Sequence, residues 1–139
     1  MSTDTDGRAA AITALTATLT SGLDEDEAAA KAAAGEVWEY RDSWVWAESF
    51  EVADVFGIPD TDETGIHIAR HDPARVLREV TAKRAIVTRY AAVRRAFGDR
   101  EGGLWPDVTR REKSHAYATL CDLAGIWSDH PDYQDEWAS

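Results

Sequence analysis

Hydrophobic residues recur at helical spacing in the first quarter of the chain. The spacing is three or four residues, which places side chains on one face of a helix, in the series Ile12, Leu15, Leu19 and Leu23. Residues 28–34 are rich in alanine, the strongest helix former, and Gly35 supplies a stop signal. The pattern predicts a helix that ends at Gly35.

The period changes to two between Val37 and Phe56, where aromatic and β-branched residues are frequent and residues 41–43 could form a turn. Most of the large hydrophobic residues stand at even-numbered positions, that is, at one parity: Trp38, Tyr40, Trp44, Trp46, Phe50, Val52 and Phe56. Because strand side chains alternate between two faces, this predicts a two- or three-stranded antiparallel meander with these residues on its buried face. An open aromatic platform for a base, a sugar or a peptide is the alternative to a core role for the tryptophans.

Further along, residues 57–65 have loop composition and helical periodicity returns from Pro73 to Phe97. Thr109 and Glu112 form a capping box that predicts the start of a third helix. The stripe expected to be buried on that helix is Ala116, Leu120, Leu123 and Trp127. Together the elements predict an α+β fold with about three helices packed on a small antiparallel meander.

The composition is that of a soluble protein with a strongly acidic surface. A chain of 139 residues is the usual size of one domain, so we expect a single domain over 1–139. It has 26 acidic and 15 basic residues, a net charge of −11, which argues against direct binding to nucleic acid. The acids favour a basic protein partner, with patches at Asp24, Glu25, Asp26 and Glu27 and at residues 60–63. A surface that mimics DNA is a further alternative.

The single cysteine and the N-terminal residues bear on the compartment. Cys121 alone cannot form an internal disulfide, and we expect it to be a buried, inert thiol, with His115 exposed nearby. The opening MSTDTDGRAA lacks the basic and apolar regions of a secretory signal, and no apolar run reaches the roughly 18 residues of a membrane span. We therefore expect a cytoplasmic protein that does not enter a membrane.

The stretch HIARHDPARVL, residues 67–77, offers two interpretations. His67, His71 and Asp72 are three possible metal ligands, and His130 could complete a site if the tail folds back. Alternatively, Asp72 caps a helix that begins at Pro73, because proline disfavours helical geometry in the residue before it. The backbone chemistry favours the cap, with no metal bound and with His67 to His71 in the preceding connection, for which a single helical turn is one option.

The C-terminal tail repeats a histidine, an aspartate and a proline at a chain reversal. We hypothesise one polar–aromatic cluster, which either locks the tail or forms a binding surface: Arg70, His71, Asp132, Tyr133 and Trp137. Trp105, in a loop with no periodic reason for burial, is the best single candidate for contact with a partner.

The chain carries no nucleotide-binding glycine motif, nucleophile elbow or zinc-protease motif. This favours a non-enzymatic protein without a cofactor, acting by protein–protein binding. A metal-binding protein or metal-dependent hydrolase that uses the histidines is the alternative. Leu77 and Ile86 lie off the main stripe of the Pro73–Phe97 helix, so a homodimer is also open.

Three stretches resemble an uncharacterised family of small actinobacterial and phage proteins: LDEDEAAAKAAAGEVW (23–38), HIARHDPARVLREVTAKRAIV (67–87) and DHPDYQDEW (129–137). In that family an acidic helix leads to a tryptophan, then a HDPARVL-type helix start and a DHPDY tail. Many relatives carry a pair of cysteines before the tail helix; residues 98–115 of this chain have none, so a metal role there does not carry over. The resemblance implies an origin and no activity.

Overall fold

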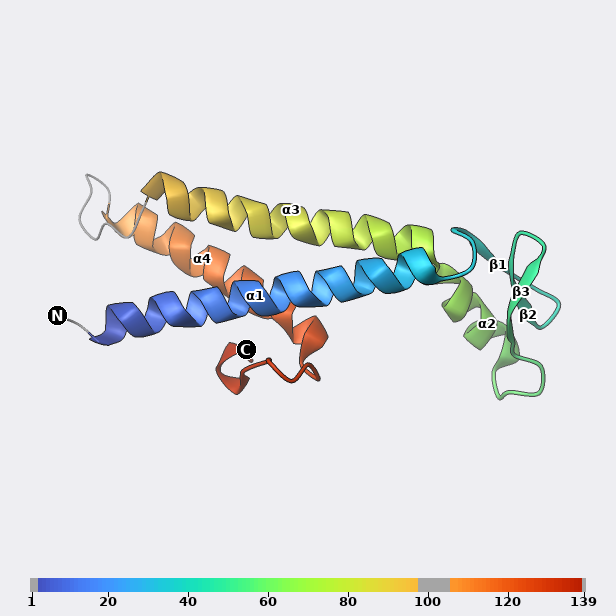
Figure 1. Ribbon diagram of the computed structural model, residues 1–139. Coiled ribbons are helices and arrows are strands. Elements are labelled where there is room, and N and C mark those ends of the chain that lie inside the picture. The colour runs from blue at the N-terminus through green and yellow to red at the C-terminus, as the bar shows by residue number, and fades with distance from the viewer. Residues whose placement is uncertain (1–2, 98–105, 139) are drawn as a thin grey trace. The chain divides into compact units, whose positions relative to one another are not determined.

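The computed structural model describes residues 3–97 and 106–138, and the side chains of 12–90 and 115–138. Its elements are, in order, α1 (Thr3–Ala32), β1 (Trp38–Arg41), β2 (Trp44–Ala47), β3 (Phe50–Asp54), α2 (Thr61–Arg70), α3 (Pro73–Phe97), α4 (Pro106–Ala124) and the 3-10 helices η1 (Gly125–Trp127) and η2 (Asp135–Trp137) (Figure 1). The fold is α+β as predicted, with four α-helices in the described residues rather than three.

The chain divides into two compact units. Asp24–Thr81 forms one, here called the sheet unit, and Met1–Leu23 with Ala82–Ser139 forms the other, the helical unit. Each unit is described by itself. The expectation of a single domain stays a prediction.

Helix α1 buries the leucine stripe that the sequence predicts, with Leu15 and Leu19 fully buried. The helix ends at Ala32 and not at Gly35, which has a φ of 71° in the connection to β1. A Cβ on Gly35 would lie 2.8 Å from the Cβ of Ala47, so both the backbone angle and the close approach require glycine there.

The three strands pair antiparallel in the order β1-β2-β3. Asp42 and Ser43 have φ values of 52° and 67°, the left-handed geometry of a two-residue type I′ turn, and Arg41 pairs with Trp44 across it. The meander and its first turn are therefore confirmed.

The buried face of the sheet differs from the one that parity predicts. Across the two-residue turn Tyr40 pairs with Val45, so residues of opposite parity share a face. Val45 and Ala47 are buried, whereas Phe50 and Phe56 are 67% and 79% exposed. The prediction of one buried parity through the whole segment is therefore wrong, because the turn exchanges the two parities.

The prediction of a loop over residues 57–65 is also wrong, because α2 begins at Thr61. This helix packs against β1 and β2. The ring of Tyr40 occupies the space that a Cβ on Gly65 would need, and the Tyr40 hydroxyl donates a hydrogen bond to Asp62 at 2.6 Å. The two glycines, the proline and the acidic residues of 57–65 are typical of a loop, and α2 is short and begins within that stretch.

Helices α3 and α4 follow their predictions more closely. α3 has the predicted bounds, Pro73 to Phe97. α4 begins at Pro106, three residues before the start predicted at Thr109. The side chains of the predicted capping box, Thr109 and Glu112, lie outside the described residues. Proline suits the first helical position because the amide hydrogen that it lacks has no partner there.

The core of the helical unit includes part of the predicted α4 stripe. Leu120 and Trp127 are buried, while Ala116 and Leu123 are half-buried. A Cβ on Gly22 would lie 2.6 Å from the Trp127 ring, so α1 lies directly against this indole.

Candidate functional site

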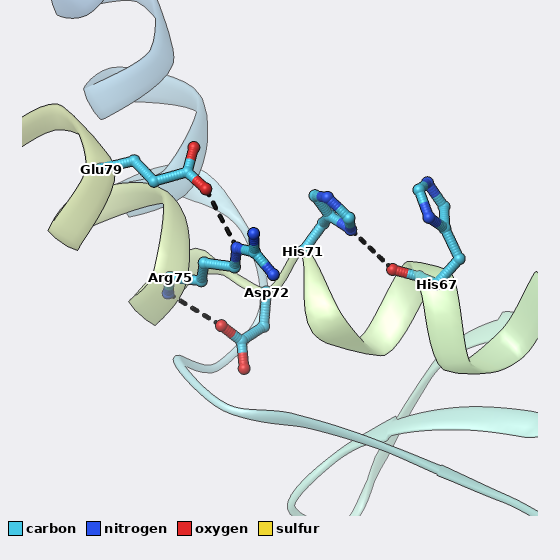
Figure 2. Close-up of polar contacts among 5 residues, drawn as sticks. All are labelled: His67, His71, Asp72, Arg75 and Glu79. Atoms are coloured by element: carbon cyan, nitrogen blue, oxygen red, sulfur yellow. Dashed lines mark hydrogen bonds and ion pairs between the residues drawn. The ribbon is translucent and has the colours of Figure 1, made fainter. Parts of the chain in front are cut away.

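Asp72 connects the start of α3 to the sheet within the sheet unit. Figure 2 shows its bond to Arg75 at the helix start. Its Oδ1 accepts the backbone N–H of Arg75 at 2.9 Å, and its Oδ2 accepts the N–H of Trp38 at 3.2 Å. The predicted helix cap is confirmed, and the second bond ties the helix start to β1. Arg75 also pairs with Glu79 on the next turn, at 3.0 Å.

His67 lies in the last turn of α2 and His71 at its C-terminal end, so the connection before Asp72 is helical. Their ring centroids are 4.4 Å apart, and His71 Nδ1 lies 2.8 Å from the carbonyl oxygen of His67 (Figure 2). Because a carbonyl oxygen can only accept, Nδ1 of His71 donates and only its Nε2 can bind a metal. Among the side chains described, those of 12–90 and 115–138, no group of three or more His, Cys, Asp or Glu residues is arranged to hold a metal ion.

His130, the third histidine of the metal hypothesis, belongs to the helical unit. Its Nδ1 accepts the backbone N–H of Asp132 at 3.2 Å. The Asp132 carboxylate lies 3.9 Å from the same nitrogen. The histidine and the aspartate together shape the turn before the last residues.

The proposed tail cluster divides between the two units. Arg70 and His71 lie in the sheet unit; Asp132, Tyr133 and Trp137 lie in the helical unit. Within the tail, Tyr133 and Trp137 pack edge to face with centroids 5.5 Å apart, and Trp137 is buried. Its indole ring is therefore part of a core, and its Nε1 has no hydrogen-bond partner.

The thiol of Cys121 is buried on α4, and His115 is exposed. Burial raises the pKa of Cys121, and burial likewise raises the pKa of Tyr117, one helical turn earlier. A buried thiol that stays protonated is a poor nucleophile, which agrees with the expectation of an inert cysteine.

The two faces of the sheet have different environments. α2 covers the face that carries Tyr40 and Val45, and its Asp62 accepts the Tyr40 hydroxyl, which raises the pKa of that tyrosine. Because side chains alternate along β2, Trp44 and Trp46 point to the other face. Both are half-buried and their ring centroids are 6.3 Å apart. They do not lie in the core under a helix, which is where the sequence placed them.

Charged residues flank these two tryptophans on the neighbouring strands. Trp44 is paired with Arg41 on β1 and Asp54 on β3. Trp46 is paired with Glu39 and Glu51 in the same way. We call the face made by Trp44, Trp46, Arg41, Glu39, Glu51 and Asp54 the tryptophan face.

Among the side chains that the structure describes (12–90 and 115–138), most of the large exposed hydrophobic ones belong to the sheet unit. They are Val37, Phe50, Phe56, Ile58 and Ile66. In the described part of the helical unit, Ile126 is the one comparable residue. Exposed apolar side chains gathered in one part of a protein mark contact surfaces.

The sheet unit also carries nearly all the net charge. It contains 15 acidic and 5 basic residues, whereas the helical unit contains 11 and 10. The net charges are −10 and −1, which together give the −11 of the chain. The net charge of the whole chain conceals this division, which a count of charges by segment reveals.

The predicted acidic patches have local partners. In the first, the Glu27 carboxylate pairs with Lys31 at 2.6 Å. In the second, Asp62 and Glu63 lie in the first turn of α2, where negative charge stabilises the helix dipole. Trp105, the predicted partner contact, lies outside the described residues.

Residues 13–139 match a family of unknown function, DUF6221, and the chain belongs to this family. No curated protein and no solved structure matches it. In the described residues, no helix is long and apolar enough to cross a membrane.

Proposed function

We propose that this protein is a non-enzymatic binding protein that recognises a basic protein partner through its sheet unit. One observation carries the proposal: the unit that holds the net charge of −10 is also the unit that exposes Val37, Phe50, Phe56, Ile58 and Ile66. Charge accelerates the encounter with a basic surface, and apolar anchors hold the complex once formed.

This proposal alters the residues first expected to contact a partner. Phe56 and Phe50 take the anchoring role that the sequence suggested for Trp105, because their side chains are shown to be exposed. The acids of α1 and of residues 60–63 contribute to the overall field of the unit.

The cellular setting is part of the proposal. A single cysteine is usual for the reducing cytoplasm, where we place the binding activity. The motif resemblance supports an actinobacterial or phage origin, in which a small acidic protein would act as an accessory or regulatory factor.

Affinity purification from the native host, followed by mass spectrometry, tests the proposal. The wild-type chain is compared with Phe56→Ser and with Ile126→Ser, which removes an exposed apolar side chain from the helical unit (51% exposed). We expect a basic protein to be retained by the wild type and by Ile126→Ser, and lost with Phe56→Ser. No reproducible partner, or equal retention by both variants, would contradict the proposal.

A DNA-mimic inhibitor is the second candidate, favoured by the same concentration of acids in 58 residues of sequence. Such a protein would bind the DNA site of a nuclease or regulator. If the captured partner binds DNA, excess duplex DNA should displace it from the protein. Simultaneous binding of DNA and of this chain would exclude mimicry while leaving the first proposal intact.

The metal-binding alternative now rests on the adjacent rings of His67 and His71. Elemental analysis of protein purified without a histidine tag tests it. Stoichiometric zinc or manganese in the wild type that is lost in His71→Ala would support a metal protein and contradict the first proposal.

A further inference from the structure

The tryptophan face is an unpartnered sheet surface in the described part of the sheet unit. α2 is the helix that packs against the strands, and it does so on the opposite face, against Tyr40. Figure 1 shows α2 beside the three strands. Half-buried indoles therefore remain accessible on Trp44 and Trp46.

A cation already lies on this face. The guanidinium carbon of Arg41 lies 5.3 Å from the ring centroid of Trp46, within the range of a cation–π interaction. Trp46 Nε1 also donates to the carbonyl oxygen of Arg41 at 3.4 Å, which holds the ring in place. The face can thus bind a guanidinium group on an indole.

The flanking charges favour additional cations. Three of the four residues paired with the tryptophans are acidic: Glu39, Glu51 and Asp54. None of the three makes an ion pair within the described residues. Asp54 uses Oδ1 to accept the N–H of Phe56 at 2.9 Å, and its other oxygen has no such bond. Arg41 alone does not balance three carboxylates.

The spacing of the two indoles fits an extended ligand. Alternate side chains of an extended chain lie about 6.6 Å apart, close to the 6.3 Å between the Trp44 and Trp46 centroids. Cationic side chains at every second position of a partner segment would therefore meet successive indoles. Planar guanidinium groups stack on aromatic rings better than ammonium groups do.

We propose that the tryptophan face docks an extended segment of the basic partner that carries arginine at alternate positions. One arginine stacks on Trp44 and is balanced by Asp54. The next meets Trp46, which it shares with Arg41, and is balanced by Glu51. This inference rests on the proposed function and names the surface and the partner chemistry.

The test uses the full chain, labelled with ¹⁵N, and an eight-residue peptide of alternating arginine and serine. The tryptophan indole N–H signals are assigned with Trp44→Phe and Trp46→Phe. We expect the peptide to shift the signals of Trp44 and Trp46 and to leave those of Trp127 and Trp137 in place. A peptide of alternating glutamate and serine should shift none.

Charge variants give a second readout that does not disturb the aromatic residues. Glu51→Gln and Asp54→Asn should each weaken peptide binding about two- to fivefold, the range of an exposed ion pair. Asparagine at 54 can still accept the Phe56 N–H. Glu63→Gln is the matched control, an acid of the same unit on α2, and should change affinity less than either.

The outcomes separate the two proposals. Peptide binding that leaves the Trp44 and Trp46 signals unchanged, or equal weakening by all three charge variants, would overturn the tryptophan face and keep a basic partner. No binding of the arginine peptide would overturn the arginine segment, while the proposed function still depends on its own capture experiment with Phe56→Ser.

Discussion

Replacing Asp72 with alanine removes the acceptor that joins α3 to β1. The Arg75 N–H, 2.9 Å from Oδ1, loses its cap, which costs about 1 kcal/mol of unfolding free energy at a typical N-terminal cap. The Trp38 N–H, 3.2 Å from Oδ2, loses a partner in a half-buried position, at about 1 kcal/mol more. We expect Asp72→Ala to lower the free energy of unfolding by about 2 kcal/mol.

Urea unfolding followed by circular dichroism measures this difference. Asp72→Asn keeps one oxygen that can accept, so its loss should be about half that of the alanine variant. Asp129→Ala is the control, because Asp129 is exposed and has no interaction in the described residues; it should stay within about 0.5 kcal/mol of wild type. A similarly small effect of Asp72→Ala would refute the structural role of the cap and favour a ligand role for HIARHDPARVL.

Three further predictions concern the helical unit. Gly22→Ala should lower the free energy of unfolding by about 1–3 kcal/mol in thermal unfolding, since the added Cβ would lie 2.6 Å from the Trp127 ring. Gly125→Ala is the control: the space around its Cβ is open, so the free energy of unfolding should hardly change. Cys121 should resist alkylation at pH 8 in the native protein and react in urea. Burial raises the pKa of Cys121 above 9.0 in the folded protein. The protonated thiol therefore contributes stability below the pKa of the unfolded state, and this contribution is lost as the pH rises through the pKa of the folded state. The decline of stability with pH should be shallower in Cys121→Ala. Trp137→Ala should lower the free energy of unfolding by about 3–5 kcal/mol. Trp137→Phe should lower it clearly less, because phenylalanine keeps a ring in the core and removes an indole N–H that has no partner. Equal losses in the two variants would contradict that account.

Hydrophobic periodicity was sufficient for the long helices and the meander. The leucine stripe of α1 and the bounds of α3 are read directly from spacing, and Asp72 with Pro73 marked a helix start correctly. α2 was not predicted because it begins within a stretch, residues 57–65, whose glycines, proline and acids are typical of a loop. Its contact with the sheet, in which Gly65 leaves room for the Tyr40 ring, is tertiary. No local pattern reports such a contact.

The candidate site was harder to predict than the fold. The tryptophans stand out in the sequence, but the two-residue turn at Asp42 and Ser43 exchanges strand parities. The parity pattern therefore assigns Trp44 and Trp46 to the wrong face of the sheet. The charge division between the units became visible only once the unit boundaries were known.

The affinity of the full chain for a fluorescent arginine–serine peptide at two salt concentrations tests the central claim most directly. An acidic binding surface predicts measurable affinity at low ionic strength, clear weakening as salt screens the charges, and no binding of the glutamate–serine peptide. Equal binding of the two peptides, or an affinity for the arginine peptide that does not change with salt, would contradict a charge-guided interaction at the sheet unit.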